Sequence, residues 1–230
     1  MKSLLKISTV VFMLAGFIPA NAEEAAPAPA AVPVVAAPAV ADPAVKKAAL
    51  EMIEQSKMSD LFKDAVMKSM QETLKEEKAA FDEETAYSTT PIDKCVKDYF
   101  DWNAKMAQDA GIKHFDSAKF NDAVATIYAD IFTVEDIAQM KAFYATPAGH
   151  EYLANGGNMK GLDRAAITQI VEFETSPAGK KLKDKDTEIS QRIEKADIMN
   201  EFFKNLRTDI LVNRMEYLEK CPSIEKYSIM

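Results

Sequence analysis

The residues best suited to metal chemistry are two histidines and one short acidic stretch. "HEYLA" at 150–154 begins like the zinc-protease pattern H-E-x-x-H, but Ala154 stands where the second histidine ligand is needed. The other histidine, His114, lies in the loop-like stretch "GIKHFD". "DKDTE" at 184–188 starts like a calcium loop, but Ile189 replaces the glycine that such a loop needs. We therefore predict no metal site and no cofactor, and interpret 184–188 as a charged helix surface.

Motifs for nucleophilic or phosphate chemistry are missing from the sequence. It contains no P-loop, no G-x-G-x-x-G, no G-x-S-x-G elbow and no C-x-x-C. We therefore assign no catalytic residues and expect no enzyme activity. A cryptic hydrolase, with catalytic side chains scattered over the fold, stays open as the last alternative.

The two cysteines, Cys95 and Cys221, are far apart in the sequence. In an oxidising compartment such an even pair favours a disulfide. Each could instead be a small buried apolar side chain. We favour the bridge.

One pattern, a phenylalanine followed by a hydroxyl residue and Pro-Ala-Gly, occurs twice at an offset of thirty residues. The matching positions are Phe143, Tyr144, Thr146, Pro147 and Gly149 in the first copy, and Phe173, Ser176, Pro177 and Gly179 in the second. A Ser or Thr hydroxyl caps a new helix, proline suits its first position, and glycine allows a close approach of a neighbouring element. We predict two related αα-corners, with copies at about 133–153 and 163–183.

The motif also leaves room for a binding role, because the two copies differ. Tyr144 in the first copy corresponds to Glu174 in the second, so Tyr144 is the first position to mutate. We expect Tyr144→Ala to spare the fold and Pro147→Ala to lower stability.

The chain that carries these residues is helical by composition. After Pro43 proline and glycine are scarce, and Ala, Leu, Lys, Glu and Met favour helices. The apolar spacing predicts an all-α fold, a single helical bundle, with helices near 44–57, 59–80, 93–110, 116–130, 133–145, 147–154, 162–175 and 177–219. Because no proline or glycine interrupts 180–220, the last of these is predicted to be one helix about 60 Å long.

Residues 131–153, "IFTVEDIAQMKAFYATPAGHEYL", resemble the signature of a bacterial exported family, domain-of-unknown-function family 2059. The resemblance extends over approximately 95–180. It implies an all-α envelope protein with a signal peptide. It brings no catalytic residues.

The N-terminus predicts export. Residues 1–22 combine Lys2 and Lys6, a short apolar run and an A-x-A cleavage signature, which is typical of a cleaved signal peptide. Residues 23–44 are rich in alanine and proline and predict an extended, disordered linker. The domain at 45–230 follows. Without residues 1–22 the chain has 26 basic and 36 acidic residues, a net charge of −10. This charge disfavours nucleic acid and anionic membranes as partners.

The sequence therefore predicts an exported, soluble helical protein of the periplasm, with secretion left open and no transmembrane segment after signal cleavage. Its main predicted role is a non-enzymatic interaction or envelope-maintenance protein that binds another protein or an apolar ligand. The alternative is a carrier that holds a lipid or another apolar small molecule in a groove between helices. The sequence leaves the identity of the partner and the oligomeric state open.

Overall fold

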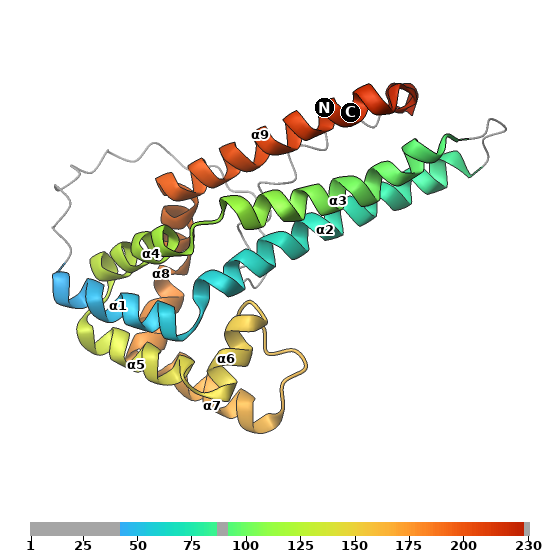
Figure 1. Cartoon of the computed structure of the whole chain (residues 1–230). Coiled ribbons are helices and arrows are strands. Elements are labelled where there is room, and N and C mark those ends of the chain that lie inside the picture. The colour runs from blue at the N-terminus through green and yellow to red at the C-terminus, as the bar shows by residue number, and fades with distance from the viewer. Residues whose placement is uncertain (1–41, 87–91, 228–230) are drawn as a thin grey trace, which may run out of the picture. The chain divides into compact units, whose positions relative to one another are not determined.

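The computed structural model describes residues 42–86 and 92–227, and these residues form helices without strands (Figure 1). The all-α prediction is confirmed. The elements are α1 (Pro43–Gln55), α2 (Met58–Thr85), α3 (Lys94–His114), α4 (Ser117–Ile131), α5 (Val134–Tyr144), α6 (Pro147–Ala154), α7 (Arg164–Thr175), α8 (Pro177–Glu194), α9 (Asp197–Lys220) and the 3₁₀ helix η2 (Pro222–Tyr227). The predicted signal peptide and almost all of the predicted linker lie outside the described residues.

The first helix begins inside the stretch predicted as linker. Pro43 occupies the first turn of α1, and the Asp42 carboxylate accepts a hydrogen bond from the Ala44 backbone N–H at 2.8 Å. An acidic N-cap followed by proline is a helix-start signal, because proline needs no hydrogen-bond partner in the first turn. The helical chain therefore starts at Pro43, two residues before the predicted boundary.

The contacts between helices divide the described chain into two compact units, whereas the sequence analysis treated 45–230 as one domain. Unit 1 contains residues 57–123 and 191–227, and unit 2 contains 42–56 and 124–190. The boundaries between the units fall inside α4 and α8, so each of these helices contributes to both.

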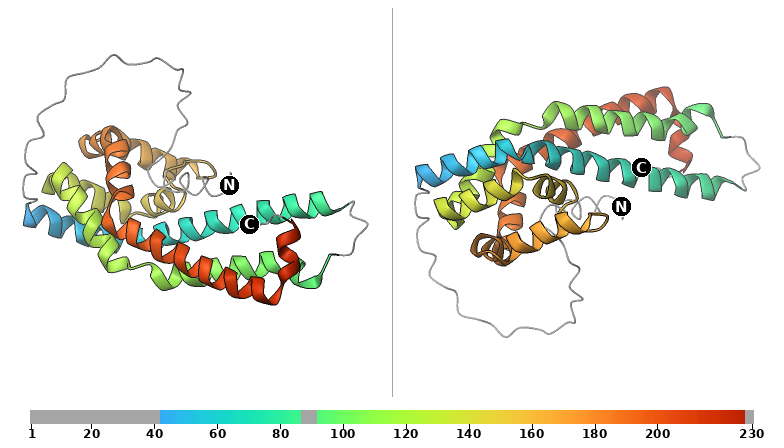
Figure 2. Two further views of the ribbon diagram at one scale, coloured as in Figure 1. Left: turned by 90° about the horizontal axis from the view of Figure 1, so that it is seen from above. Right: turned by 90° about the horizontal axis from the view of Figure 1, so that it is seen from below.

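Unit 1 is built on the three long helices α2, α3 and α9, seen from two further sides in Figure 2, and α3 packs against both of the others. Its core contains a cluster of phenylalanine rings from α2, α4, α9 and the residue after α3. Ring centroids lie 4.7 Å apart for Phe62 and Phe120, and 5.7 Å apart for Phe115 and Phe202. A second apolar cluster lies where the N-terminal end of α3 meets the C-terminal end of α9 and η2, and its buried members are Phe81, Val96, Tyr99, Phe100, Cys221 and Ile224.

Unit 2 is built from α1, α5, α6, α7 and the adjoining parts of α4 and α8. Helix α1 packs against α5, and α6 packs against both α5 and α7. The buried apolar side chains of the α1–α5 layer include Ala49, Met52, Ile53, Ile137 and Met140. An ion pair between Lys141 and Glu51, at 2.9 Å, joins the same two helices at the surface.

The long C-terminal helix predicted over 177–219 is wrong, because the chain breaks between α8 and α9. Ala196 has extended backbone angles (φ −64°, ψ 140°) and precedes a new helix. No proline or glycine causes this break. In one continuous helix, Ile189 and Phe202 would be rotated by about 220° from each other and would face nearly opposite sides. Both side chains are buried, so the break allows each half to present its own apolar stripe to its own unit.

Among residues 42–86 and 92–227, no helix combines the length and the apolar composition that crossing a bilayer requires.

Candidate functional site

The two Pro-Ala-Gly turns of unit 2 use the same hydrogen bonds. The Gly149 N–H donates to Thr146 Oγ1 at 3.0 Å, and the Gly179 N–H donates to Ser176 Oγ at 3.1 Å. Pro147 begins α6 and Pro177 begins α8. The hydroxyl residue thus caps the new helix, and proline occupies the position where its missing donor costs nothing.

Each glycine in these turns lies against the backbone of the preceding helix. A β-carbon at Gly149 would lie 2.1 Å from the Phe143 carbonyl oxygen, and one at Gly179 would lie 2.0 Å from the Phe173 carbonyl oxygen. No side-chain rotation can relieve such an overlap, because the obstructing atoms are backbone. Glycine is therefore required for the chain to fold back tightly at both turns.

The phenylalanines of the two turns meet in space. Their rings stack with centroids 4.1 Å apart and planes 5° apart. Tyr144 packs against this pair, with its ring centroid 6.0 Å from that of Phe173, and is only 4% exposed. The burial of Tyr144 argues against the expectation that Tyr144→Ala spares the fold, because this side chain belongs to the core of unit 2. Pro147, by contrast, is exposed.

A small polar group adjoins this aromatic core. The Tyr152 hydroxyl donates to Glu174 Oε1 at 2.8 Å. Burial raises the pKa of the Asp186 carboxyl to about 6. Burial also raises the pKa values of Tyr128, Tyr144 and Tyr152, and the negative charge of Asp186 contributes to all three. The four groups are therefore electrostatic neighbours.

Asp186 is a residue that sequence reasoning missed. The stretch 184–188 was interpreted as charged surface, and this holds for Asp184, Thr187 and Glu188, which are exposed. Asp186 is only partly exposed. The signal was its position three residues before the buried Ile189, which places it near the inward face of α8.

Lys181 of α8 makes two further contacts with residues at or just before the start of α5. Lys181 donates to Asp136 Oδ2 at 2.8 Å, and its Nζ lies 5.5 Å from the centre of the Phe132 ring. Burial raises the pKa of Asp136, but the hydrogen bonds from Lys181 and Thr133 outweigh it and lower the pKa overall. The Asp136 carboxylate also accepts a hydrogen bond from the Thr133 backbone N–H, as part of a capping box at the start of α5. The Lys181–Asp136 contact joins α5 to α8.

The structural roles of the motif residues thus explain why these amino acids occur at these positions. They cap helices, allow a tight turn and fill the aromatic core. We find in them no arrangement that points to a substrate.

A second candidate lies in unit 1, where a pocket of about 470 Å³ opens between the α3–α4 turn and α9. Most of its lining residues are polar or charged; the lining is Lys113, His114, Phe115, Asp116, Ser117, Lys119, Ile198, Glu201, Phe202 and Asn205. Beside this pocket, Asp209 Oδ2 lies 2.7 Å from both His114 Nε2 and Lys113 Nζ. These hydrogen bonds, first from Lys113 and then from His114, lower the pKa of Asp209.

Ser117 and His114 share the lining of this pocket. His114 Nε2 lies in hydrogen-bond contact with Asp209, and Lys113 engages the same Asp209 oxygen. In the part of the chain that the structure describes, no hydrogen bond joins Ser117 to His114, as a nucleophile activated by histidine would need. The polar lining also differs from the mainly apolar sites that hold lipids or other apolar small molecules. Within the described chain, no group of three or more His, Cys, Asp and Glu side chains is placed to hold a metal ion.

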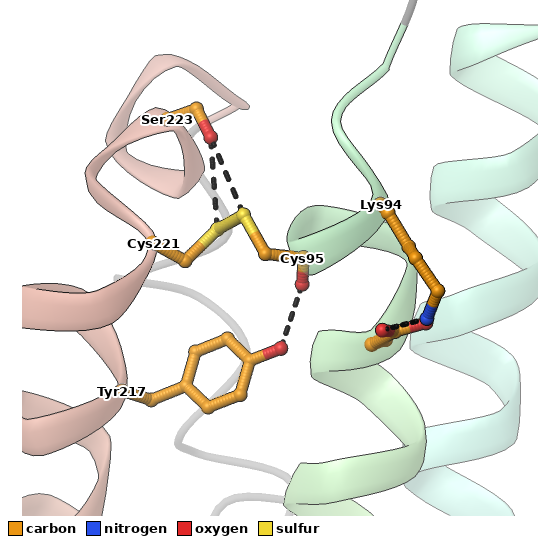
Figure 3. Close-up of a disulfide and its surroundings, with 6 residues drawn as sticks. Lys94, Cys95, Tyr217, Cys221 and Ser223 are labelled. Atoms are coloured by element: carbon orange, nitrogen blue, oxygen red, sulfur yellow. Dashed lines mark hydrogen bonds and ion pairs between the residues drawn. A yellow bond between two sulfur atoms is a disulfide. The ribbon is translucent and has the colours of Figure 1, made fainter.

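The predicted disulfide between Cys95 and Cys221 is confirmed (Figure 3). It joins the first turn of α3 to the end of α9, with 5.9 Å between the two Cα atoms. The Ser223 hydroxyl lies 3.6 Å from each sulfur, and the Tyr217 hydroxyl donates to the Cys95 carbonyl oxygen at 2.7 Å. The bridge therefore links α3 covalently to the end of α9 within the second apolar cluster of unit 1.

The most unusual surface of unit 1 is the side of α9 that faces away from α3. Leu211, Val212 and Met215 are 52%, 53% and 62% exposed. Met215 lies four residues after Leu211 and three after Val212, and residues at these spacings are neighbours on a helix surface. The three side chains therefore form one patch, which we call the α9 outer face. None of these three residues was singled out from the sequence.

Comparison with known proteins gives one match. Residues 118–160 match the family model described as "Uncharacterized protein conserved in bacteria (DUF2059)". No curated protein and no solved structure is similar enough to match. The matched segment covers most of α4, all of α5 and α6, and the first Pro-Ala-Gly turn, and is narrower than the resemblance over 95–180. This match supports the family assignment made from the sequence: residues 118–160 are similar to the bacterial family DUF2059.

Proposed function

We propose that this chain is a non-enzymatic interaction protein of the bacterial cell envelope, and that it binds another protein through the α9 outer face. The observation that carries the proposal is the exposure of Leu211, Val212 and Met215 side by side on one helix. Large apolar side chains that share one patch are typical of protein-binding surfaces, whereas single ones are scattered over most proteins.

The envelope assignment rests on the sequence and on compartment chemistry. Residues 1–22 have the organisation of an export signal. A disulfide is typical of proteins that leave the reducing cytoplasm, and Cys95 and Cys221 form one. The match to a family conserved in bacteria is consistent with the periplasm as the oxidising compartment.

A protein partner agrees with the exposed face better than a small apolar ligand does. The apolar side chains of the α9 outer face lie on a convex helix surface, and the pocket in the same unit has a mostly polar lining. A lipid carrier instead needs a concave apolar site that buries most of its ligand.

Site-specific photo-crosslinking in intact cells tests the proposal. A photoreactive amino acid is placed at Met215, or at Val171 as the control. Val171 is also an exposed apolar side chain, but it lies on α7 in unit 2. We expect covalent protein adducts from position 215 and none, or different ones, from position 171. If position 215 gives no protein adduct, the proposal is wrong.

A further inference from the structure

We infer that the α9 outer face binds a second copy of the same chain, with the two α9 helices packed antiparallel around a two-fold axis. This inference rests on the proposed function, because it uses the same face and names the partner. The face carries apolar side chains at its centre and opposite charges at its two ends, and this pattern is complementary to itself.

The two-fold axis lies midway between Leu211 and Val212. Around that point, Leu211 of one copy faces Val212 of the other, and Thr208 faces Met215. The same symmetry places Lys204 opposite Glu219. Every one of these side chains is exposed, and the spacings of three, four and seven residues place them along one side of the helix. A symmetric contact of this kind uses one patch twice, as in most homodimers.

Lys204 and Glu219 supply the charge complementarity. They are fifteen residues apart, or about 22 Å along the helix, so they cannot pair within one chain. Among the residues that the structure describes, neither takes part in an ion pair. Glu219 also lies in the last turn of α9, where the helix dipole disfavours a negative charge. Its position is thus not explained by the stability of its own helix.

An antiparallel arrangement is the one that the charges select. It places Lys204 of each copy beside Glu219 of the other, so the favourable pair forms twice. A parallel arrangement would place lysine beside lysine and glutamate beside glutamate. Glu201, which lies further along the same side, already pairs with Lys119 of its own chain at 3.5 Å.

The size of the face sets the expected strength. A single helix face about 22 Å long is small beside stable dimer interfaces, which bury about 1,200–2,000 Å² in total. We therefore expect a reversible equilibrium between monomer and dimer, shifted toward the dimer by protein concentration.

Sedimentation velocity of the purified chain, with its disulfide intact, tests the inference. We expect the fitted mass to rise with concentration from one chain to two. Val212→Glu places a charge at the centre of the contact and is expected to weaken association by about a hundredfold or more. Val171→Glu, the same substitution at an exposed site in unit 2, is expected to leave association unchanged. A wild-type chain that stays monomeric at every concentration overturns the inference, as does a dimer that Val212→Glu leaves intact.

A charge-reversal cycle tests the orientation. Lys204→Glu and Glu219→Lys are each expected to weaken the dimer roughly tenfold, because each reverses two symmetry-related pairs. The double variant restores both pairs and is expected to recover most of the affinity. If the double variant is weaker than either single one, the antiparallel register is wrong.

The crosslinks at position 215 separate failure of this inference from failure of the proposed function. Adducts with twice the mass of one chain support the second copy. Adducts only with a different protein, together with a monomeric purified chain, overturn the inference but leave the proposed function standing. No adducts and no dimer overturn both.

Discussion

The rings of Phe143 and Phe173 stack almost in parallel, with centroids 4.1 Å apart and planes 5° apart. The two residues hold the same place in their respective copies of the repeated sequence, three residues before the capping hydroxyl. The two turns therefore meet through equivalent side chains. This contact is a physical reason for the repeated sequence, because each turn supplies one ring of the stacked pair.

The coupling between these two rings is directly measurable. We expect Phe143→Leu and Phe173→Leu each to destabilise the protein, and the double variant to lose less than the sum of the two. The expected coupling is about 1 kcal/mol, because aromatic pairs contribute roughly that much beyond their buried area. A double-mutant cycle in urea provides the measurement. Strictly additive losses would show that the stacking itself contributes nothing.

Gly149→Ala and Gly179→Ala are expected to destabilise the protein by roughly 2–3 kcal/mol each, because the added carbon overlaps a backbone carbonyl that cannot move freely. Alanine forms helices better than glycine by about 1 kcal/mol, so helix propensity alone predicts the opposite sign. Denaturant unfolding decides between the two. A stabilised Gly149→Ala variant would mean that the turn opens without cost.

Tyr144→Ala is expected to cost about 3–5 kcal/mol, as for other buried aromatic side chains. Pro147→Ala is expected to cost less than about 1 kcal/mol, because Pro147 is exposed and contributes mainly by restricting the unfolded chain. Thermal unfolding of both variants checks this order. It reverses the order that the sequence suggested, and an equal loss in the two would contradict it.

Removal of the disulfide is expected to lower the free energy of unfolding by about 4–5 kcal/mol, because the bridge spans 126 residues. The matched comparison is wild type against Cys95→Ala/Cys221→Ala, each with and without reductant. Reductant should destabilise only the wild type. If reductant destabilised the double variant equally, its effect would not come from the bridge.

Asp186 is expected to make stability depend on pH in a defined direction. Its folded pKa of about 6 is above the ordinary value of 3.8, so the folded state holds this proton more tightly than the unfolded state. Stability from this group is complete below about pH 4 and is lost as the pH rises through 6. Asp186→Asn removes that loss. We expect the variant to gain roughly 1 kcal/mol over wild type at pH 7, an amount reduced because Asp186 is half-exposed and screened by solvent.

The measurement is the difference in unfolding free energy between wild type and Asp186→Asn from pH 4 to pH 8. The difference isolates Asp186 from acids such as Asp136, whose lowered pKa acts in the opposite direction. A difference that does not change with pH would show that Asp186 titrates normally.

Local sequence signals predicted the helix starts well. Thr133, Thr146, Asp163 and Ser176 are of residue types that cap helices, and each accepts a hydrogen bond from the backbone N–H three residues further along. Capping depends only on neighbours along the chain, so one sequence contains the information. The Asp42–Pro43 start was readable for the same reason, but the alanine- and proline-rich stretch before it hid the signal.

Long-range packing was not predictable in the same way. The break at Ala196 has no local cause, and it follows from the need of Ile189 and Phe202 to enter different cores. The burial of Tyr144 depends on Phe173, twenty-nine residues further along. The pairing of His114 with Asp209 joins residues almost a hundred positions apart. The disulfide was the one long-range contact that the sequence predicted, because a cysteine forms this bond only with another cysteine.

The bridge between Cys95 and Cys221 closes a covalent ring that contains α4 to α8 and most of α3 and α9. A protease that cuts one peptide bond inside this ring opens the chain but releases no fragment, because the two pieces stay joined through sulfur. In a compartment that contains proteases, a nicked molecule can therefore keep its helices together and remain one particle. Of the described helices, α1, α2 and η2 lie outside the ring, on arms that a single cut can detach.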